Sequence, residues 1–156
     1  MILSRTTQYA IQALIYMATQ PRGVAVLNRT IAENLGAPPT YLAKVLQNLC
    51  RGNLLYSYRG KQGGFRLREE GEKITLMQIV IITEGPGFTE DCVLGLKICS
   101  DKVPCPMHAK WSPIKQEIVK LLKDQTLDIL AAAVMSGKYQ LTDLPAAALG
   151  DLKPRA

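Results

Sequence analysis

The stretch GAPPTYLAKVLQNLCRGNLLYSYRGKQGGFRL, residues 36–67, has the pattern of a helix followed by a β-hairpin. Apolar residues recur at positions 42, 45, 46 and 49, which is the i, i+3, i+4, i+7 spacing of one helix face. We expect this helix to begin around Pro39 and Thr40 and to be closed by Gly52. Residues 54–58 then predict a strand, residues 59–64 a glycine-rich turn, and residues 65–67 the returning strand.

Two further helical patterns precede this stretch. A first helix is expected from Ser4, a good N-cap, to about Thr19, because Pro21 stops it. A second helix follows Asn28 as its cap and ends at Gly36, which can take the left-handed conformation that a helix end favours. The connection to the third helix is as tight as in a helix-turn-helix. The order of elements predicts a mainly α fold with a small β-hairpin wing, that is, a winged helix-turn-helix.

The net charge of +6 is unevenly distributed along the chain. Residues 1–68 hold nine Lys and Arg side chains and one acidic side chain, a balance of 9 − 1 = +8. The remaining residues hold ten basic and twelve acidic side chains, a balance of −2. The amino-terminal part is therefore suited to a polyanion, and the rest is not.

Polar residues of the third helix and of the hairpin tip are candidate DNA contacts. Side-chain donors on the helix suit phosphate oxygens and base edges in a major groove, which admits one helix. Arg59 and Lys61 flank Gly60 at the tip, where the backbone can approach another surface closely. A solvated helix face and a flexible basic loop are the alternative interpretations. The helix candidates are Thr40, Tyr41, Lys44, Gln47, Asn48 and Arg51.

Three of the four cysteines and the only histidine lie within residues 92–108. Cys92, Cys99, Cys105 and His108 follow the pattern C-x6-C-x5-C-x2-H. Thiolates and imidazole are the ligands of soft and borderline metals, so the pattern predicts a metal or iron-sulfur site. Structural zinc sites usually include a closely spaced cysteine pair, which is missing here, but the chemistry alone leaves zinc and a cluster open. Cys50, at the end of the third helix, is interpreted as a packing residue.

The apolar segments of the chain suggest a cytoplasmic protein. No apolar run reaches the roughly 18 residues that a membrane span needs, and residues 10–18 show the core-facing pattern of an amphipathic helix rather than a signal sequence. In the cytoplasm thiols stay reduced, so clustered cysteines are more often ligands or redox centres than structural disulfides.

The second half of the chain predicts a connector, a loop and a long helix. Thr75 and Gln78 form a capping box for a short helix that ends near Gly85. Ser112 is the expected cap of a helix over residues 112–136, with Pro113 at its first position. The expected parts are thus a DNA-binding domain (1–74), a connecting helix and cluster loop (75–111), a dimerisation helix (112–136) and a flexible tail (137–156). The apolar side of the long helix, which could serve a dimer or a single-chain bundle, holds Ile114, Ile118, Leu121 and Leu122.

The chain resembles the Rrf-two family of bacterial transcription regulators over residues 1–134. The matching segments are PTYLAKVL (39–46), GNLL (52–55), RGKQGGF (59–65) and CPMHAKW (105–111). The resemblance implies a homodimer that binds a partly palindromic DNA operator and holds an iron-sulfur cluster on Cys92, Cys99 and Cys105. Its IscR-like members imply His108 as the fourth ligand of a 2Fe-2S cluster, and a 4Fe-4S cluster is the alternative. In NsrR-like members an acidic side chain near the start of the first helix can be the fourth ligand, but this chain has Gln8 at the matching position.

The resemblance also implies DNA contacts at Thr40, Tyr41 and Lys44 and wing contacts at Arg59, Gly60 and Lys61. Two departures matter: Ala43 replaces an acidic residue found in some members, and the first cysteine gap is six residues rather than five. Together these features predict a cluster-dependent, DNA-binding transcription regulator, acting as a repressor, that senses redox state, nitric oxide or iron-sulfur status.

Two alternative functions stay open from the sequence. One keeps the DNA-binding fold and uses the three thiols as a metal-free disulfide switch. The other is an enzyme with a cysteine nucleophile and His108 as its base. The sequence shows no oxyanion-forming motif, nucleotide loop or paired acidic site, so we expect no enzymatic activity.

Overall fold

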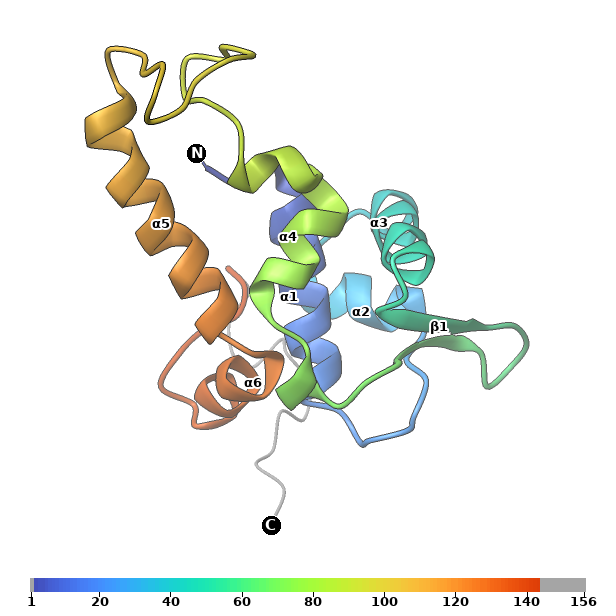
Figure 1. The fold of residues 1–156 in the computed structure, drawn as a ribbon. Helices are drawn as coiled ribbons and strands as arrows, with labels where there is room; N and C mark the ends of the chain where they lie inside the picture. The colour runs from blue at the N-terminus through green and yellow to red at the C-terminus, as the bar shows by residue number, and fades with distance from the viewer. Residues whose placement is uncertain (1, 144–156) are drawn as a thin grey trace.

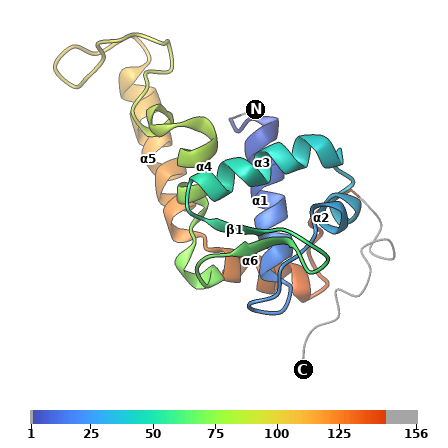
Figure 2. The same cartoon turned by 90° about the vertical axis from the view of Figure 1, so that its right-hand side faces the viewer.

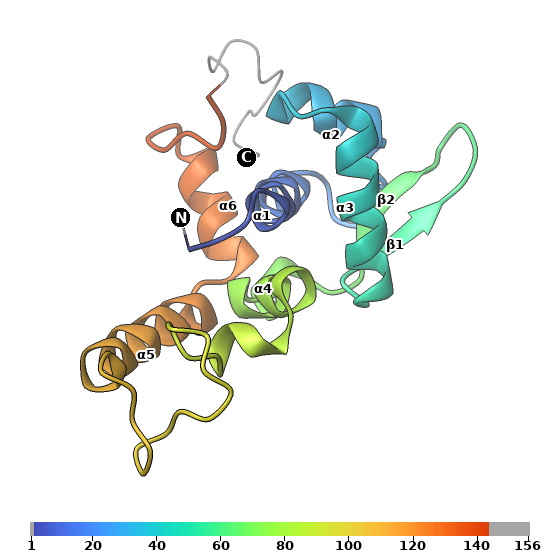
Figure 3. The same ribbon diagram turned by 90° about the horizontal axis from the view of Figure 1, so that it is seen from above.

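The structure is a computed structural model that describes residues 2–143. Helix α1 (Arg5–Ala18) runs through the middle, and α2, α3, α4 and α6 surround it (Figures 1 and 3). Ser4 caps α1 as predicted, since its side chain accepts a hydrogen bond from the Thr7 amide at 3.3 Å. The centre of α1 is buried, with Ala10, Ala13 and Leu14 fully inaccessible to water. This helix is therefore the axis on which the other elements pack.

Helices α2 (Asn28–Leu35) and α3 (Pro39–Arg51) form the predicted helix-turn-helix. Gly36 ends α2 in the left-handed conformation, with φ +63°. The predicted cap at Asn28 is wrong, because Asn28 is already helical and its side-chain amide donates to the Pro39 carbonyl at 3.0 Å. Asn28 thus ties the start of α2 to the start of α3 rather than capping its own helix.

The end of α3 differs from the prediction in one detail. Gly52 follows the helix, but its φ is −78° and the left-handed residue is Asn53, with φ +63°. A Cβ atom on Gly52 would lie 2.5 Å from the Ile82 side chain on α4. Glycine is therefore needed at position 52 for close packing, and Asn53 makes the turn.

Strands β1 (Leu55–Tyr58) and β2 (Gly64–Leu67) form the predicted wing. They pair antiparallel, with Leu55 opposite Leu67 and Ser57 opposite Phe65. The Phe65 amide and carbonyl both bond to Val26, at 2.8 Å each, so the base of the wing is fastened to the segment before α2. Gly64 has φ +120°, and a Cβ there would lie 2.3 Å from the Val26 carbonyl oxygen. Position 64 therefore requires glycine, both because of its positive φ and because Val26 leaves no room for a Cβ atom.

The second half of the chain returns to α1. After the short helix η1 (Gly71–Lys73), α4 (Leu76–Glu84) begins at the predicted Thr75 and Gln78 capping box. The short helix η2 (Pro86–Thr89), a loop, α5 (His108–Asp124) and α6 (Leu127–Met135) follow. Met77 and Val80 of α4 pack against Leu122 of α5, while Leu127 of α6 joins the main core around α1.

The single long helix predicted over residues 112–136 is wrong. Helix α5 begins at His108, so Pro113 lies inside it, and Ser112 is not its cap. Gln125 is extended, and Thr126 caps the separate helix α6 by accepting from the Ile129 amide. The break has a physical reason, because the Gln125 carbonyl accepts from the Leu76 amide at 2.9 Å and the turn lets α6 pack on α1.

The predicted flexible tail, 137–156, begins with residues that are attached to the fold. Leu141 packs against the main core, and Thr142 is buried. The rest of that prediction, residues 144–156, lies outside the described residues. Over residues 2–143, each helix is too short or too polar to span a bilayer.

Candidate metal centre and nucleic-acid interface

The loop between η2 and α5 brings the three predicted cysteines together. The Sγ atoms of Cys92, Cys99 and Cys105 all lie within 4.8 Å of one another. Figures 1 and 2 show this loop beside the start of α5, on the far side of the molecule from the wing. The three thiols are free, and Cys105 is buried. The loop has almost no core of its own, so its order rests on these contacts and on its two ends.

The four predicted ligands form two close pairs. Cys92 Sγ lies 3.6 Å from Cys105 Sγ, and Cys99 Sγ lies 3.2 Å from His108 Nδ1. His108 occupies the first position of α5, and its amide donates to the Cys105 carbonyl at 3.0 Å. The start of α5 therefore places the imidazole next to the thiols.

Asp101 orients the His108 ring. The carboxylate oxygen lies 2.9 Å from Nε2, on the side of the ring opposite Cys99. An ionised carboxylate only accepts hydrogen bonds, so it favours the tautomer with the proton on Nε2. The lone pair of a neutral ring is then on Nδ1, facing the thiols. Carboxylate partners of this kind commonly fix the ring orientation of metal-binding histidines.

The environment of the loop separates the cysteine pKa values. Backbone amides of Leu94 and Leu96 donate to Cys92 and lower its thiol pKa to about 7. For Cys99, a backbone hydrogen bond from Cys105 lowers the pKa, but desolvation and the neighbouring thiols outweigh it and raise the pKa. Cys92 is therefore substantially thiolate at neutral pH, which is the form that binds metal or attacks a disulfide.

One set of contacts joins the start of the loop to α5, and another joins the end of α4, which precedes the loop, to α1. The Lys115 ammonium of α5 donates to the carbonyls of Glu90 and Asp91 at 3.4 and 3.5 Å. Just before the loop, the Glu84 carboxylate accepts from the Ser4 amide at 2.7 Å and from the Thr7 hydroxyl. These hydrogen bonds lower the pKa of Glu84 in spite of the desolvation that raises it. The end of α4 is thus attached to the start of α1.

The loop also exposes apolar side chains to solvent. Ile98 is 75% exposed, and five other apolar residues of this segment are at least two-fifths exposed. The five are Val93, Leu94, Leu96, Val103 and Met107.

Helix α3 presents five of the six predicted polar residues on its outer face, whereas Asn48 is half-buried and its side-chain amide donates to the Ile82 carbonyl of α4 at 3.5 Å. Thr40, Lys44 and Arg51 are exposed, while the opposite face is buried against the core. Tyr41 is 37% exposed, and its hydroxyl is hydrogen bonded to Thr6 of α1. Its ring packs edge-on against Tyr9, with ring centroids 5.7 Å apart. The recognition face therefore includes a tyrosine that is already held in place by α1.

The wing tip carries the other predicted contacts. Arg59, Gly60 and Lys61 are all exposed, and Gly60 has φ +97° with open space around it. The Gly63 amide donates to the Gly60 carbonyl at 2.9 Å and closes the turn. The two cations stand on a well-defined turn rather than on an irregular loop.

This combination of wing, recognition helix and cysteine centre matches one protein family. The profile of the Rrf2 (Rrf-two) family, described as iron-dependent transcriptional regulators, matches residues 3–133. The chain belongs to the Rrf2 family. The Rrf2 match spans the helix-turn-helix, the wing and the cysteine loop, so it covers both candidate sites.

Individual Rrf2-type proteins agree with this assignment. A protein of Aquifex aeolicus, named as an HTH-type transcriptional regulator, is 36% identical over 129 residues, covering 81% of this chain and 89% of the relative. The solved structure of T. potens IscR has a TM-score of 0.69 at 27% identity and covers 88% of this chain and 92% of that one. The global cysteine regulator CymR of B. subtilis shares the fold, with a TM-score of 0.70 at 24% identity over 84% of this chain and 96% of that one.

Sequence reasoning missed the residues that support the two sites. Asp101, Lys115 and Glu84 act through contacts between distant segments, and their spacing gave no signal. Arg5 was also missed: its guanidinium lies 5.0 Å from the centre of the Tyr9 ring. Because Tyr9 contacts Tyr41, Arg5 adds a cation beside the recognition helix.

Proposed function

We propose that this protein is a homodimeric, DNA-binding repressor whose affinity for its operator depends on an iron-sulfur cluster held by Cys92, Cys99, Cys105 and His108. The observation that carries the proposal is the convergence of these four donors in a chain that belongs to a family of iron-dependent regulators. The proposed signals are redox state, nitric oxide or the supply of clusters, and the proposed location is the cytoplasm.

The donor set fits a 2Fe-2S cluster. Metal–sulfur bonds of about 2.3 Å in a tetrahedral site put two ligands on one metal about 3.8 Å apart. The Cys92–Cys105 separation of 3.6 Å and the Cys99–His108 separation of 3.2 Å are both of this size. Cys92, Cys99, Cys105 and His108 would hold the cluster. When bound, the cluster supplies a centre that can gain or lose one electron and that oxidants can dismantle.

Zinc and a 4Fe-4S cluster are the competing occupants. Three thiols within 4.8 Å could also surround a single ion, as in a Cys₃His zinc site. The family description favours iron. Anaerobic purification followed by iron and sulfide analysis, with Mössbauer spectra, tests the assignment. One zinc ion per chain without sulfide would refute it.

The DNA contacts follow from the exposed basic face. We place Thr40, Tyr41, Lys44 and Arg51 of α3 in the major groove, with Arg59, Gly60 and Lys61 of the wing against the flanking backbone. These positions are exposed, and the charge of this half of the chain suits phosphate.

The exposed side of α5 is the proposed dimer contact. Of the apolar stripe predicted there, Leu122 is buried and Ile118 is packed beside it against α4, whereas Ile114 is 52% exposed and Leu121 is 57% exposed. The stripe is therefore only half covered within one chain. Pairing of two α5 helices would cover the remainder and set the spacing of two recognition helices, which must meet grooves about 34 Å apart. Leu121→Lys should shift sedimentation toward the monomer.

Helix α4 offers a physical route between the two sites. Its end holds the cluster loop, and its Ile82 packs against Gly52 at the end of α3. The Asn48 side chain of α3 also reaches the Ile82 carbonyl, at 3.5 Å. A change in the order of the loop could move α4, and α4 could move the recognition helix or the dimer spacing.

A cysteine comparison tests the coupling. Cys99→Ala removes one proposed ligand, whereas Cys50→Ala is the matched control because Cys50 packs against the main core and burial raises its thiol pKa. Cys99→Ala should lose the visible absorption of the cluster and bind DNA as the cluster-free wild type does, and Cys50→Ala should behave as the wild type does in both forms. Identical DNA binding by the loaded wild type and by Cys99→Ala would disprove the coupling.

A metal-free thiol switch is the second candidate function. It is favoured by Cys92, which has a thiol pKa of about 7 and lies 3.6 Å from the Cys105 sulfur. Oxidation would join these two sulfurs in a disulfide, with two electrons and two protons passing to the oxidant. Protein isolated anaerobically without iron and sulfide, yet with oxidant-dependent DNA binding that Cys105→Ala abolishes, would establish this alternative. In either case we propose a regulator with no enzymatic activity.

A further inference from the structure

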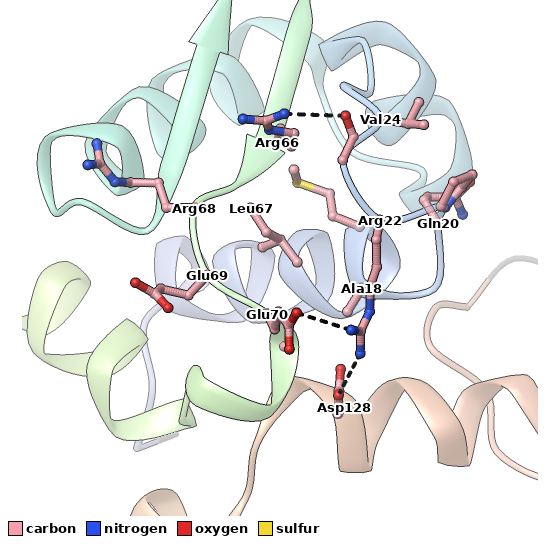
Figure 4. Close-up of a pocket in the computed structure, with 14 residues that line it drawn as sticks. Ala18, Gln20, Arg22, Val24, Arg66, Leu67, Arg68, Glu69, Glu70 and Asp128 are labelled. Atoms are coloured by element: carbon pink, nitrogen blue, oxygen red, sulfur yellow. Dashed lines mark hydrogen bonds and ion pairs between the residues drawn. The ribbon is translucent and has the colours of Figure 1, made fainter.

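A cavity of about 270 Å³ lies at the base of the wing, away from the cysteine loop. Its walls come from the end of α1, the segment that follows it, strand β2, η1 and the first turn of α6 (Figure 4). It is therefore formed where the wing meets the body of the protein. A space of this size is slightly below the range of about 300–1,000 Å³ for drug-sized ligands, and suits a small metabolite.

The charges that line this cavity are balanced. Three are positive and three are negative: Arg22, Arg66, Arg68, Glu69, Glu70 and Asp128. Arg22 pairs with two of the acidic residues, with its guanidinium 3.2 Å from Glu70 and 3.9 Å from Asp128 (Figure 4). Its side chain is 72% exposed, and exposed ion pairs contribute little stability, so a ligand can displace either contact at little cost.

Arg66 stands across the cavity from Glu70 and Asp128, whereas the guanidinium of Arg22 lies beside these two carboxylates (Figure 4). Arg66 of β2 donates to the Gly23 carbonyl at 3.5 Å, and its guanidinium also lies 5.3 Å from the ring centres of Tyr56 and Tyr58. Only one of its five N–H groups is used in this hydrogen bond, so the others can bind a ligand. Asp128 and Glu70 lie on the opposite side, on α6 and beside η1. Between them, Met17, Ala18 and Leu67 supply an apolar floor. A simple anion would be repelled by the carboxylates, and a simple cation would be repelled by the arginines.

We propose that this cavity binds a free α-amino acid in its zwitterionic form. The carboxylate of the ligand pairs with Arg66 and Arg22, its ammonium pairs with Glu70 and Asp128, and its side chain lies on the apolar floor. The arrangement satisfies both signs of charge at once, as charge-assisted hydrogen bonds require.

Such a ligand would connect the wing to α6. One side of the cavity is the returning strand of the wing, and the other is the first turn of α6, which packs on α1. An amino acid bound across them would fix the wing relative to the body. Any effect of the amino acid on DNA affinity must then equal the effect of DNA on amino-acid affinity. The amino acid would thus be a second signal, bound at a site separate from the proposed cluster.

Thermal unfolding of the full-length protein, with each standard L-amino acid in millimolar excess, tests the inference without DNA or iron. At about ten times its Kd, a bound amino acid should raise Tm by about 3–6 °C. Arg22→Gln should remove most of this rise. Arg29→Gln is the matched control, since Arg29 is also an exposed arginine in an ion pair, with Glu33 at 2.8 Å, but lies outside the cavity. It should keep the full rise.

The chemistry of the ligand is tested with derivatives of the amino acid that gives the largest rise. Its methyl ester lacks the carboxylate charge and its N-acetyl form lacks the ammonium, so both should lose the effect. Succinate, a simple dianion, should have none. The inference is overturned if no amino acid raises Tm, if Arg22→Gln and the wild type respond equally, or if succinate or the derivatives act as well as the amino acid.

Discussion

The wing tip should carry a measurable share of the electrostatic DNA affinity. Arg59 and Lys61 are exposed on the turn, and within residues 2–143 neither forms an ion pair with an acidic side chain. Replacing both by alanine therefore removes two free cations from each chain without breaking an internal contact. Stability should change by less than about 0.5 kcal/mol.

The expected magnitude follows from counterion release. A dimer with two wings loses four cations, and each phosphate contact contributes about −0.9 to the slope of log K against log salt, so the slope should become shallower by about 3.6. Between 50 and 200 mM salt, a fourfold change, the affinity advantage of the wild type should shrink by about 150-fold. If only one wing touches the duplex at a time, the change in slope halves.

Fluorescence anisotropy on a labelled mixed-sequence duplex measures this slope without knowledge of the operator. A double replacement of Lys73 and Lys138 is the control, since it removes the same charge from exposed positions on the α6 side of the molecule. The control should leave the slope near that of the wild type. A slope unchanged in the Arg59→Ala/Lys61→Ala variant, or reduced equally in the control, would show that the wing does not contact phosphate.

Three further outcomes are expected. Gly64→Ala should destabilise the fold by about 3–5 kcal/mol in urea unfolding, because it strains the backbone and breaks two hydrogen bonds between Phe65 and Val26. Gly60→Ala, at a position with open space around it, should cost about 1–2 kcal/mol. Equal costs for the two variants would contradict the steric argument. Glu84→Gln should be less stable than the wild type by up to about 1 kcal/mol at neutral pH. Because folding lowers the Glu84 pKa from 4.5, the stabilisation by its charge is complete above pH 4.5 and is lost as the pH falls through the folded-state pKa. The free energies of unfolding of Glu84→Gln and the wild type should therefore converge in acid. A difference between them that does not depend on pH would show that the charge is not the cause. Asp101→Ala should weaken iron retention by about 10–100-fold in a chelator competition while leaving the Tm of the metal-free protein unchanged, and full retention would mean that the carboxylate does not orient His108.

The elements that local signals define were predictable from the sequence. Ser4, Gly36 and the Thr75 and Gln78 pair each act on their own helix ends, and each does so in the structure. The cysteines were also predictable, since their spacing needs only a short loop to bring them together. In contrast, Ser112 and Pro113 resembled a helix start, but α5 begins five residues earlier, at His108, without a capping side chain. The extent of α5 depends on tertiary contacts, namely its packing on α4 and the contacts of His108 with the cysteine loop.

The supporting residues could not be predicted because they depend on tertiary contacts. Gly52 resembled a helix terminator, yet its role is to admit Ile82 from a helix some thirty positions later in the chain. Asp101 was one acidic residue among several in an exposed loop, and only the fold places it against Nε2 of His108. The half-covered stripe on α5 is similar, since the sequence shows an apolar face but not how much of it α4 takes.

Two hydrogen bonds at Gln125 and Leu127 determine which fragments of this protein can fold by themselves. Leu76 donates to the Gln125 carbonyl, and Leu127 donates to the Ile74 carbonyl, so segments about fifty residues apart form a small clasp. Beyond it, α6 buries Leu127 against the same core that supports the recognition helix. Residues 1–74 alone would leave that side of α1 bare, and we expect the fragment to aggregate. A protease that cuts the cysteine loop should instead yield two fragments that stay associated and unfold together, because the clasp and α6 outlast the broken connection.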